Sequence, residues 1–309
     1  MAVSLAMVSA GCGQGQQENP QTVVDNGPAA ESAAQGPTIF KDNWPEKVPT
    51  SGLAKGLVLP LESYMISYAQ EIAVQQARDS AETACMNRFG FEDWRTEDLG
   101  TSPPPADNAS NMPRRYGLTD PAQARTYGYH LPSAGPESTP PPEQDTAEAA
   151  TVLTGQNGSE RLASFKGEEL PEGGCTGEVG RKVAVPDVAL VERLNTESLE
   201  LSQRTPAVEA AMVRWASCMK DRGYQVNTVW ETAEVAGAES ETADQQEIEV
   251  ATAEVDCKQE TGLVKVWFAE ETTIQKRLVE ENQQALKGAE SQLGKTLEKA
   301  AAVNRSALR

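Results

Sequence analysis

Apolar residues recur every three or four positions from Pro60 to about Phe89, which is the pattern of an amphipathic helix. Large apolar side chains form the stripe in the first half of this segment, and alanines continue it in the second half. Another helix can approach closely along an alanine face. The segment therefore predicts one continuous helix, about 45 Å long, that packs against a helix of similar length.

Three later segments repeat this periodicity. Two helices are predicted to begin at Pro186 and Pro206, because proline fits the first turn of a helix, and the second of them is predicted to end at Gly223. Residues 263–309 predict a last helix of up to about 45 residues. Together these segments predict a mainly α fold, a helical bundle with long helices.

Residues 94–150 lack this periodicity and are rich in proline and glycine. They predict an irregular insertion in the helical body. Inside it, Asp120 suits an N-cap, Pro121 suits the first helical position and Gly128 suits the end of a helix. These three residues predict a helix of one to two turns.

The same insertion gathers aromatic and cationic side chains in a chain that is otherwise acidic. One interpretation is a recognition loop for an anionic or sugar ligand. The other, which we favour, is a long insertion that lies on the helical body with its tyrosines as anchors. The candidate recognition residues are Arg114, Arg115, Tyr116, Tyr127, Tyr129 and His130.

The chain carries 46 acidic and 27 basic side chains, a formal charge of −19. A polyanion repels phosphate, so this charge excludes non-specific nucleic-acid binding. Residues 231–260 hold ten acids and one base, and account for almost half of the net charge. Calcium binding is disfavoured there, because no EF-hand loop is present. The acids stand at scattered helical positions and predict a solvated helix face.

The first eleven residues are uncharged and end in S-A-G directly before Cys12. A membrane-spanning helix needs about 20 apolar residues, so this shorter run fits a signal peptide. Small residues before a cysteine are similar to the lipobox of bacterial lipoproteins, where cleavage leaves the cysteine as an acylated N-terminus. We therefore expect residues 1–11 to be a lipoprotein signal peptide. The alternative is a disordered N-terminus with a chance cysteine.

Residues 12–45 follow as the lipidated Cys12 and a disordered tether, because they contain almost nothing that could be buried. Two or more acyl chains would hold the protein on a membrane without a spanning helix.

Four further cysteines form an even set in a chain that we expect to be exported, and export favours disulfides. A zinc site is disfavoured, since the sequence has no C-x-x-C and a single histidine. The four disulfide candidates are Cys85, Cys175, Cys218 and Cys257.

Four cysteines allow three pairings, and one internal repeat bears on the choice. Residues 85–91 read CMNRFGF and residues 218–224 read CMKDRGY, so both fit C-M-x-x-x-G-[FY]. In both, the cysteine would lie in the last turns of a helix and the glycine would be the left-handed residue past its end. If each copy links its own helix to a later segment of the same half of the chain, the pairs are Cys85 with Cys175 and Cys218 with Cys257.

The sequence lacks the residues that several enzyme classes need for catalysis. A Ser-His-Asp or Cys-His enzyme would depend on His130, and no nucleophile-elbow motif is present. Neither a Walker loop nor G-x-G-x-x-G appears, so we expect no nucleotide cofactor. A glycoside hydrolase needs only two well-placed carboxylates, and this class stays open.

Several short motifs together resemble uncharacterised secreted lipoproteins of high-GC Gram-positive (actinobacterial) bacteria. The resemblance covers most of residues 53–286 and implies export and disulfides, with no established activity. Its motifs, beside the lipobox-like start and the tether, are L-V-L-P-L-E-S-Y, C-M-x-x-x-G-F, R-Y-G…Y-G-Y-H, G-G-C-x-G-E, W-x-x-C-M-x-x-x-G-Y and V-D-C-K.

We therefore expect a lipoprotein that acyl chains hold on the outer face of the bacterial cell membrane, with residues 46–309 as a single disulfide-linked helical domain. Its expected role is that of a non-enzymatic binding or scaffolding module, without a cofactor or a metal. The expected partner is another cell-envelope protein or a cell-wall polymer. One alternative is a cell-wall carbohydrate hydrolase or binder that uses acidic residues and the tyrosine-rich insertion. Another makes helix 263–309 a docking element for a membrane complex.

Overall fold

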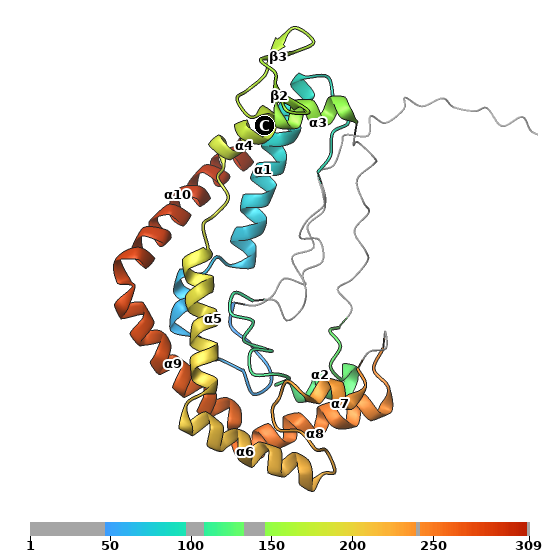
Figure 1. Cartoon of the computed structure of the whole chain (residues 1–309), viewed down its shortest axis with the longest axis vertical. Helices are drawn as coiled ribbons and strands as arrows, with labels where there is room; N and C mark the ends of the chain where they lie inside the picture. Colours follow the sequence, from blue (N-terminus) through green and yellow to red (C-terminus); the bar gives the residue numbers. More distant parts are fainter. Residues whose placement is uncertain (1–46, 97–107, 133–145, 239–241, 308–309) are drawn as a thin grey trace, which may run out of the picture. The chain divides into compact units, whose positions relative to one another are not determined.

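The computed structural model describes residues 47–96, 108–132, 146–238 and 242–307. Cys12, the signal peptide at 1–11 and the tether at 12–45 were predicted on residues outside these ranges, as were parts of the insertion. The described part is mainly helical, as predicted, and its only strands form two short hairpins (Figure 1). Residues 38–309 group into one compact unit.

The elements follow one another in a simple order. The helices are a 3-10 helix Pro60–Tyr64, α1 Tyr68–Arg88, α2 Pro121–Tyr127, α3 Ala147–Thr154, α4 Gly174–Lys182, α5 Ala189–Gln203, α6 Pro206–Asp221, α7 Thr232–Ala236, α8 Gln245–Thr261, α9 Leu263–Glu281 and α10 Gln283–Ala307. The antiparallel hairpins pair β1 Gln156–Asn157 with β2 Glu160–Arg161 and β3 Ser164–Phe165 with β4 Glu168–Glu169.

The predicted continuous helix from Pro60 to Phe89 is wrong, because the helix is interrupted between the 3-10 helix and α1. Met65 is extended, with φ −83° and ψ 147°. Ser67 then caps α1, since its hydroxyl accepts from the Gln70 backbone N–H while the Gln70 side chain accepts from the Ser67 N–H at 2.9 Å. This reciprocal pair starts a new helix where the apolar periodicity alone continues the old one.

The predicted helix 263–309 is likewise two helices, α9 and α10, which meet at Asn282. Asn282 has φ −112° and ψ 16°, and its side-chain Nδ2 donates to the Leu278 carbonyl at 2.8 Å. An asparagine side chain that bonds to nearby backbone competes with the helix ladder. Two other predictions at helix starts fare differently: α6 begins at Pro206 as predicted, whereas α5 begins at Ala189, three residues after Pro186.

The expectation that the first helix packs along a long partner is confirmed, because α1 lies against α10 (Figure 1). Ala77 of α1 and Ala300 of α10 are both buried in one cluster, and the Asn304 side chain donates to the Ala73 carbonyl at 2.9 Å. Small side chains let the two backbones approach. Elsewhere α5 packs on α9, and α6 packs on both α8 and α9.

The largest core cluster lies among α6, α8 and α9 and contains the fully buried Trp215, Trp267 and Met219. Tyr116 joins it from the insertion, with its ring centroid 5.0 Å from that of Trp267. A separate, smaller cluster surrounds Cys85 and packs α1 against α3 and α4.

Disulfides join Cys85 to Cys175 and Cys218 to Cys257, which is the pairing favoured by the repeated motif. The first links α1 to α4 and the second links α6 to α8. The two glycines of the repeat have φ +88° at Gly90 and +95° at Gly223, as predicted.

Both copies of the repeat end their helix in the same way. The residue after the glycine donates its N–H to a carbonyl five residues earlier. Phe91 donates to the Met86 carbonyl at 3.2 Å, and Tyr224 donates to the Met219 carbonyl at 3.0 Å. This is the bond of a Schellman motif, which requires a left-handed residue and therefore favours glycine.

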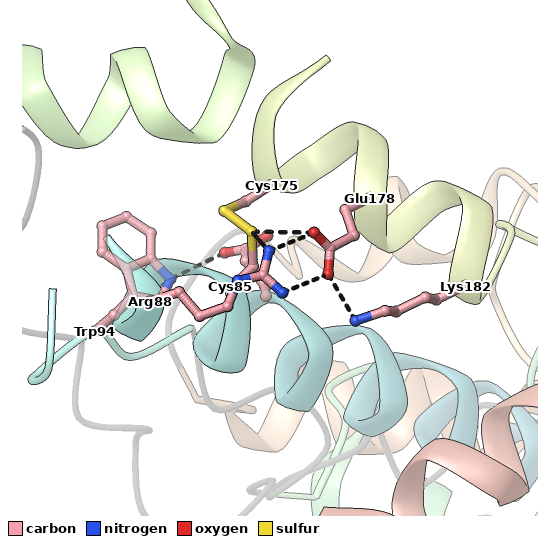
Figure 2. Close-up of a disulfide and its surroundings, with 7 residues drawn as sticks. Cys85, Arg88, Trp94, Cys175, Glu178 and Lys182 are labelled. Atoms are coloured by element: carbon pink, nitrogen blue, oxygen red, sulfur yellow. Dashed lines mark hydrogen bonds and ion pairs between the residues drawn. A yellow bond between two sulfur atoms is a disulfide. The ribbon is translucent and has the colours of Figure 1, made fainter. Parts of the chain in front are cut away.

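An arginine and a glutamate accompany each disulfide across the same two helices. Arg88 and Glu178 form an ion pair beside the Cys85–Cys175 bond, and Lys182 donates to Glu178 at 2.7 Å (Figure 2). Arg222 and Glu260 form the equivalent ion pair beside Cys218–Cys257. In both copies the glutamate stands three residues after the second cysteine of the disulfide. This part of the repeat lies outside the C-M-x-x-x-G-[FY] pattern and becomes apparent only in the fold.

We expect the Arg88–Glu178 pair to make stability depend on pH at the acid end. Hydrogen bonding from Arg88, aided by Lys182, lowers the pKa of Glu178 from 4.5 to about 2. A carboxyl with a lowered pKa in the folded state contributes stability above its unfolded pKa and loses it as the pH falls toward 2. Urea denaturation at several pH values from 5 to 2 should therefore show a steeper loss for the unmodified protein than for Glu178→Gln.

The control for this measurement is Glu148→Gln, which removes a carboxylate from an exposed ion pair with Lys166. Exposed pairs contribute little, so this variant should keep the slope of the unmodified protein. Equal slopes for Glu178→Gln and the unmodified protein would contradict the prediction.

Candidate functional site

The insertion carries the short helix that the sequence predicts. The Asp120 side chain caps α2 by accepting from the backbone N–H groups of Ala122 at 2.7 Å and Gln123 at 3.2 Å. Pro121 is its first residue and Gly128 ends it. This helix packs on α8, so it brings the candidate recognition residues onto the helical body.

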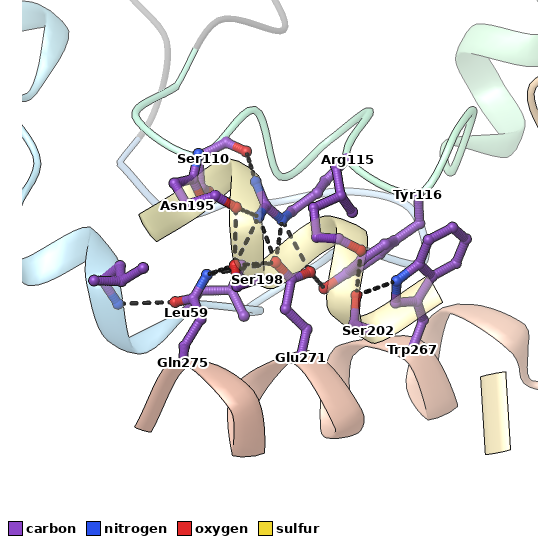
Figure 3. Close-up of polar contacts among 12 residues, drawn as sticks. Leu59, Ser110, Arg115, Tyr116, Asn195, Ser198, Ser202, Trp267, Glu271 and Gln275 are labelled. Carbon is purple, nitrogen blue, oxygen red and sulfur yellow. Dashed lines mark hydrogen bonds and ion pairs between the residues drawn. The ribbon is translucent and has the colours of Figure 1, made fainter. Parts of the chain in front are cut away.

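Arg115 and Tyr116 both bind one buried carboxylate, that of Glu271 on α9 (Figure 3). Arg115 Nε donates to Glu271 Oε2 at 3.0 Å and its Nη2 donates to Oε1, while the Tyr116 hydroxyl donates to Oε2 at 2.8 Å. The Glu271 side chain is fully buried and that of Arg115 is 4% exposed. Burial and the nearby Glu271 charge raise the pKa of Tyr116 well above its usual value, so its hydroxyl remains a donor.

Side chains of α5 and α9 complete the surroundings of Glu271 (Figure 3). The Ser198 hydroxyl lies 2.8 Å from Glu271 Oε1 and accepts from Gln275 Nε2 at 2.9 Å. The Gln275 side chain in turn accepts from the Leu61 backbone N–H at 2.9 Å. The Glu271 carboxylate and Gln275, its neighbour on α9, thus link the insertion, the 3-10 helix, α5 and α9.

A second buried ion pair lies between Glu254 and Lys258, one turn apart on α8. Both side chains are fully buried. Lys258 Nζ also donates to the Leu118 carbonyl at 2.8 Å, and the Tyr129 hydroxyl donates to Glu254 Oε2 at 2.6 Å. Burial lowers the pKa of Lys258, and Glu254 acts against this by favouring the charged ammonium.

A third buried carboxylate, that of Glu247, binds the chain just after α2. The Tyr129 backbone N–H donates to Glu247 Oε1 at 2.7 Å, and His130 Nε2 lies 3.2 Å from Glu247 Oε2. A β-carbon on Gly128 would collide with this carboxylate, so glycine is required there both for its φ of +55° and for space. Arg114 donates to the carbonyls of Tyr129 at 2.7 Å and His130 at 2.9 Å.

The structure therefore uses most of the candidate recognition residues for internal contacts. Arg115, Tyr116 and Tyr129 bind buried carboxylates, and Arg114 fixes the backbone beside His130. Tyr127 differs, because it is 39% exposed on α2. This arrangement matches the interpretation that the insertion lies on the body with tyrosines as anchors; a recognition role for these residues stays a prediction.

The prediction of a solvated acidic face over residues 231–260 is wrong for Glu247 and Glu254, which are both fully buried. The sequence does hold a signal for this. Both glutamates fall at three- and four-residue spacing with the buried Val250, Ala251 and Cys257, so they lie on the apolar stripe of α8. Acids inside an apolar stripe indicate buried partners.

No group of three or more His, Cys, Asp or Glu side chains converges within the described ranges. Among the helices described, none is both long and apolar enough to cross a bilayer. An open hollow of about 400 Å³ lies on α8, lined by Arg222, Tyr224, Gln245, Ile248, Glu249, Thr252, Ala253 and Asp256.

Comparison with known protein families, with curated proteins and with solved structures finds no match to this chain. A function is therefore inferred below from the residues of this chain.

We expect Arg115→Met to be strongly destabilising, because it leaves the Glu271 charge buried without its cation. The loss of one partner from a buried ion pair costs about 3 to 5 kcal/mol of the free energy of unfolding. Urea denaturation measures this loss. The double variant Arg115→Met with Glu271→Gln should recover part of it, since the unpaired charge is gone.

The matched control is Glu197→Gln, which breaks the exposed i,i+4 pair of Arg193 and Glu197 on α5. Its effect should stay within about 0.5 kcal/mol. If Arg115→Met cost no more than this control, the buried pair would not be what couples the insertion to α9.

Proposed function

We propose that this protein is an extracytoplasmic lipoprotein that acts as a non-enzymatic binding or scaffolding module on the outer face of the cell membrane. Acyl chains on Cys12 would hold it there, and the partner would be another cell-envelope protein or a cell-wall polymer. The resemblance to actinobacterial lipoproteins supports the same placement.

The observation that carries this proposal is the pair of interhelical disulfides. Disulfides form and persist in oxidising compartments outside the cytosol. Cys85, Cys175 and Cys257 are fully buried, so these bonds are integral to the packing of α1 on α4 and of α6 on α8. An extracytoplasmic location accounts for the presence of both bonds.

Support for a binding role comes from the way the chain uses its buried charges. Glu247, Glu254 and Glu271 have the most desolvated carboxylates described, and each is bound by residues of the insertion. These contacts hold the insertion in one position on the helical body, so the surface that it forms has a fixed shape. A fixed surface suits a module that docks onto a partner.

The alternative of a cell-wall carbohydrate hydrolase or binder loses several of the residues on which it depended. Tyr116 and Tyr129 donate to buried carboxylates, so their hydroxyls do not face a ligand. A hydrolase would need two exposed carboxylates that face one bound sugar. Release of sugars from purified cell wall, lost on substitution of a single Asp or Glu, would establish this alternative against our proposal.

We expect Cys12→Ser to release the protein from the membrane. In a Gram-positive host fed an alkyne fatty acid, the unmodified chain should sediment with membranes and carry the label, because two acyl chains suffice for stable anchoring. Cys12→Ser should lose the label and appear in the medium. Ser32→Ala, another small substitution in the predicted tether, should leave both properties unchanged.

A Cys12→Ser variant that stayed on the membrane without label would contradict the anchor. For the binding role, crosslinking in intact cells followed by mass spectrometry should identify a neighbour that the anchored protein contacts and the released variant does not.

A further inference from the structure

We infer that Cys218–Cys257 is a thiol–disulfide exchange site, at which an incoming thiolate attacks Cys218 and Cys257 is the leaving sulfur. Cys85–Cys175 serves as a fixed crosslink. The substrate class is a dithiol, such as the active-site thiol pair of an extracytoplasmic oxidoreductase. This property goes beyond the binding role proposed above.

Access separates the two disulfides. Cys218 is partly exposed on α6, whereas its partner Cys257 is fully buried in α8. Both Cys85 and Cys175 are fully buried. Exchange requires a thiolate to reach one sulfur, and Cys218 is the most exposed of these four residues, so we place the attack there.

The sulfur of Cys257 is placed to act as the leaving group. Arg222 Nη1 lies 2.8 Å from Cys257 Sγ, and the same nitrogen donates to the Ala253 carbonyl at 3.1 Å, which fixes its position. An adjacent guanidinium stabilises a thiolate, and a stabilised thiolate leaves faster. Exposure favours attack on Cys218, and Arg222 favours departure of Cys257. Both effects therefore favour the same direction of cleavage.

The step balances in atoms and electrons. A thiolate of the dithiol forms a bond to Cys218 Sγ, and the electron pair of the Cys218–Cys257 bond goes to Cys257 as a thiolate beside Arg222. The second thiol of the dithiol then loses its proton and attacks the first sulfur of the dithiol, which is now bonded to Cys218. This attack closes a disulfide in the dithiol and releases Cys218 as a thiolate that takes up a proton. The chain gains two electrons and the dithiol loses two.

Glu260 restricts which thiols react. Its Oε2 lies 3.4 Å from Cys218 Sγ, and the Glu260 side chain is 59% exposed. Its charge is partly offset by Arg222, yet it faces the attacked sulfur and repels an anionic reagent. Every attacking thiolate carries one negative charge and is slowed by Glu260, and a thiolate that bears a second anionic group, such as a sulfonate, is slowed more.

The other disulfide is an internal control with similar charges. Arg88 Nη2 lies 3.4 Å from Cys85 Sγ, and Glu178 pairs with Arg88 as Glu260 pairs with Arg222 (Figure 2). The two sites differ in access and in the sulfur that the arginine faces, which is that of Cys85 at the first site and that of Cys257 at the second. A difference in reactivity between them therefore reports on exposure together with the placement of the arginine, and the arginine variants below separate the two.

The experiment treats the folded, oxidised chain with dithiothreitol under native conditions, alkylates at intervals and maps the modified cysteines by mass spectrometry. Cys218 and Cys257 should be alkylated at least about tenfold faster than Cys85 and Cys175. Excess 2-mercaptoethanol should leave its mixed disulfide on Cys218. Equal rates at the two disulfides, or a mixed disulfide on Cys257, would overturn the inference.

Two charge variants test the roles of Arg222 and Glu260. Arg222→Gln should slow cleavage of Cys218–Cys257 by about threefold, whereas Arg88→Gln should leave that rate unchanged. Glu260→Gln should narrow the preference for 2-mercaptoethanol over the anionic mercaptoethanesulfonate. Because Arg222 also offsets the Glu260 charge, Arg222→Gln is compared with the unmodified residue in the Glu260→Gln background as well. A rate that Arg222→Gln leaves unchanged or faster in that background counts against the leaving-group assignment.

Discussion

The rest of the structure depends on the ion pair and hydrogen bonds that the buried Glu271 carboxylate makes with the insertion. This carboxylate is fully buried on α9 and accepts hydrogen bonds from Arg115 and Tyr116 of the insertion and from Ser198 of α5. A buried charge without partners is prohibitively unfavourable. Arg115 and Glu271, more than 150 positions apart in sequence, must therefore be in contact in any arrangement that places this face of α9 in the core. This requirement couples the insertion to the helical body.

Glu247 and Glu254 extend the same principle along α8. The insertion supplies Tyr129 to both of them, through its backbone N–H and its hydroxyl. Such polar contacts add little net stability compared with apolar packing, but they penalise any arrangement that leaves a charge unpaired. In a chain with an alanine-rich core, we regard them as the main source of a unique position for the insertion.

Local signals in the sequence were sufficient wherever a few neighbouring residues decide the backbone. Asp120, Pro121 and Gly128 delimit α2, and the glycines of the repeated motif end α1 and α6, because caps act within one turn. The break before α1 was also readable, as S-x-x-Q from Ser67, although the apolar stripe concealed it. The break at Asn282 depends on one side chain bonding to its own helix, which periodicity does not register.

The candidate site was harder to predict, since its partners come from distant segments, and only the fold shows that Arg115 faces Glu271. Composition likewise does not distinguish an exposed carboxylate on α8 from one in its apolar stripe, although the order of residues does.

The two disulfides show why burial matters more here than loop length. They close loops of 90 and 39 residues. Chain-entropy arguments assign such loops about 4.5 and about 4 kcal/mol, a difference too small to separate their roles. Their surroundings do separate them, because Cys85 and Cys175 belong to a small isolated cluster, whereas Cys257 belongs to the main core. The small cluster contains eight buried residues against seventeen in the main core, so its crosslink contributes a larger share of what holds α4 on α1. The main core is already fixed by Trp215, Trp267 and the buried carboxylates, and it tolerates a disulfide that reaches the surface.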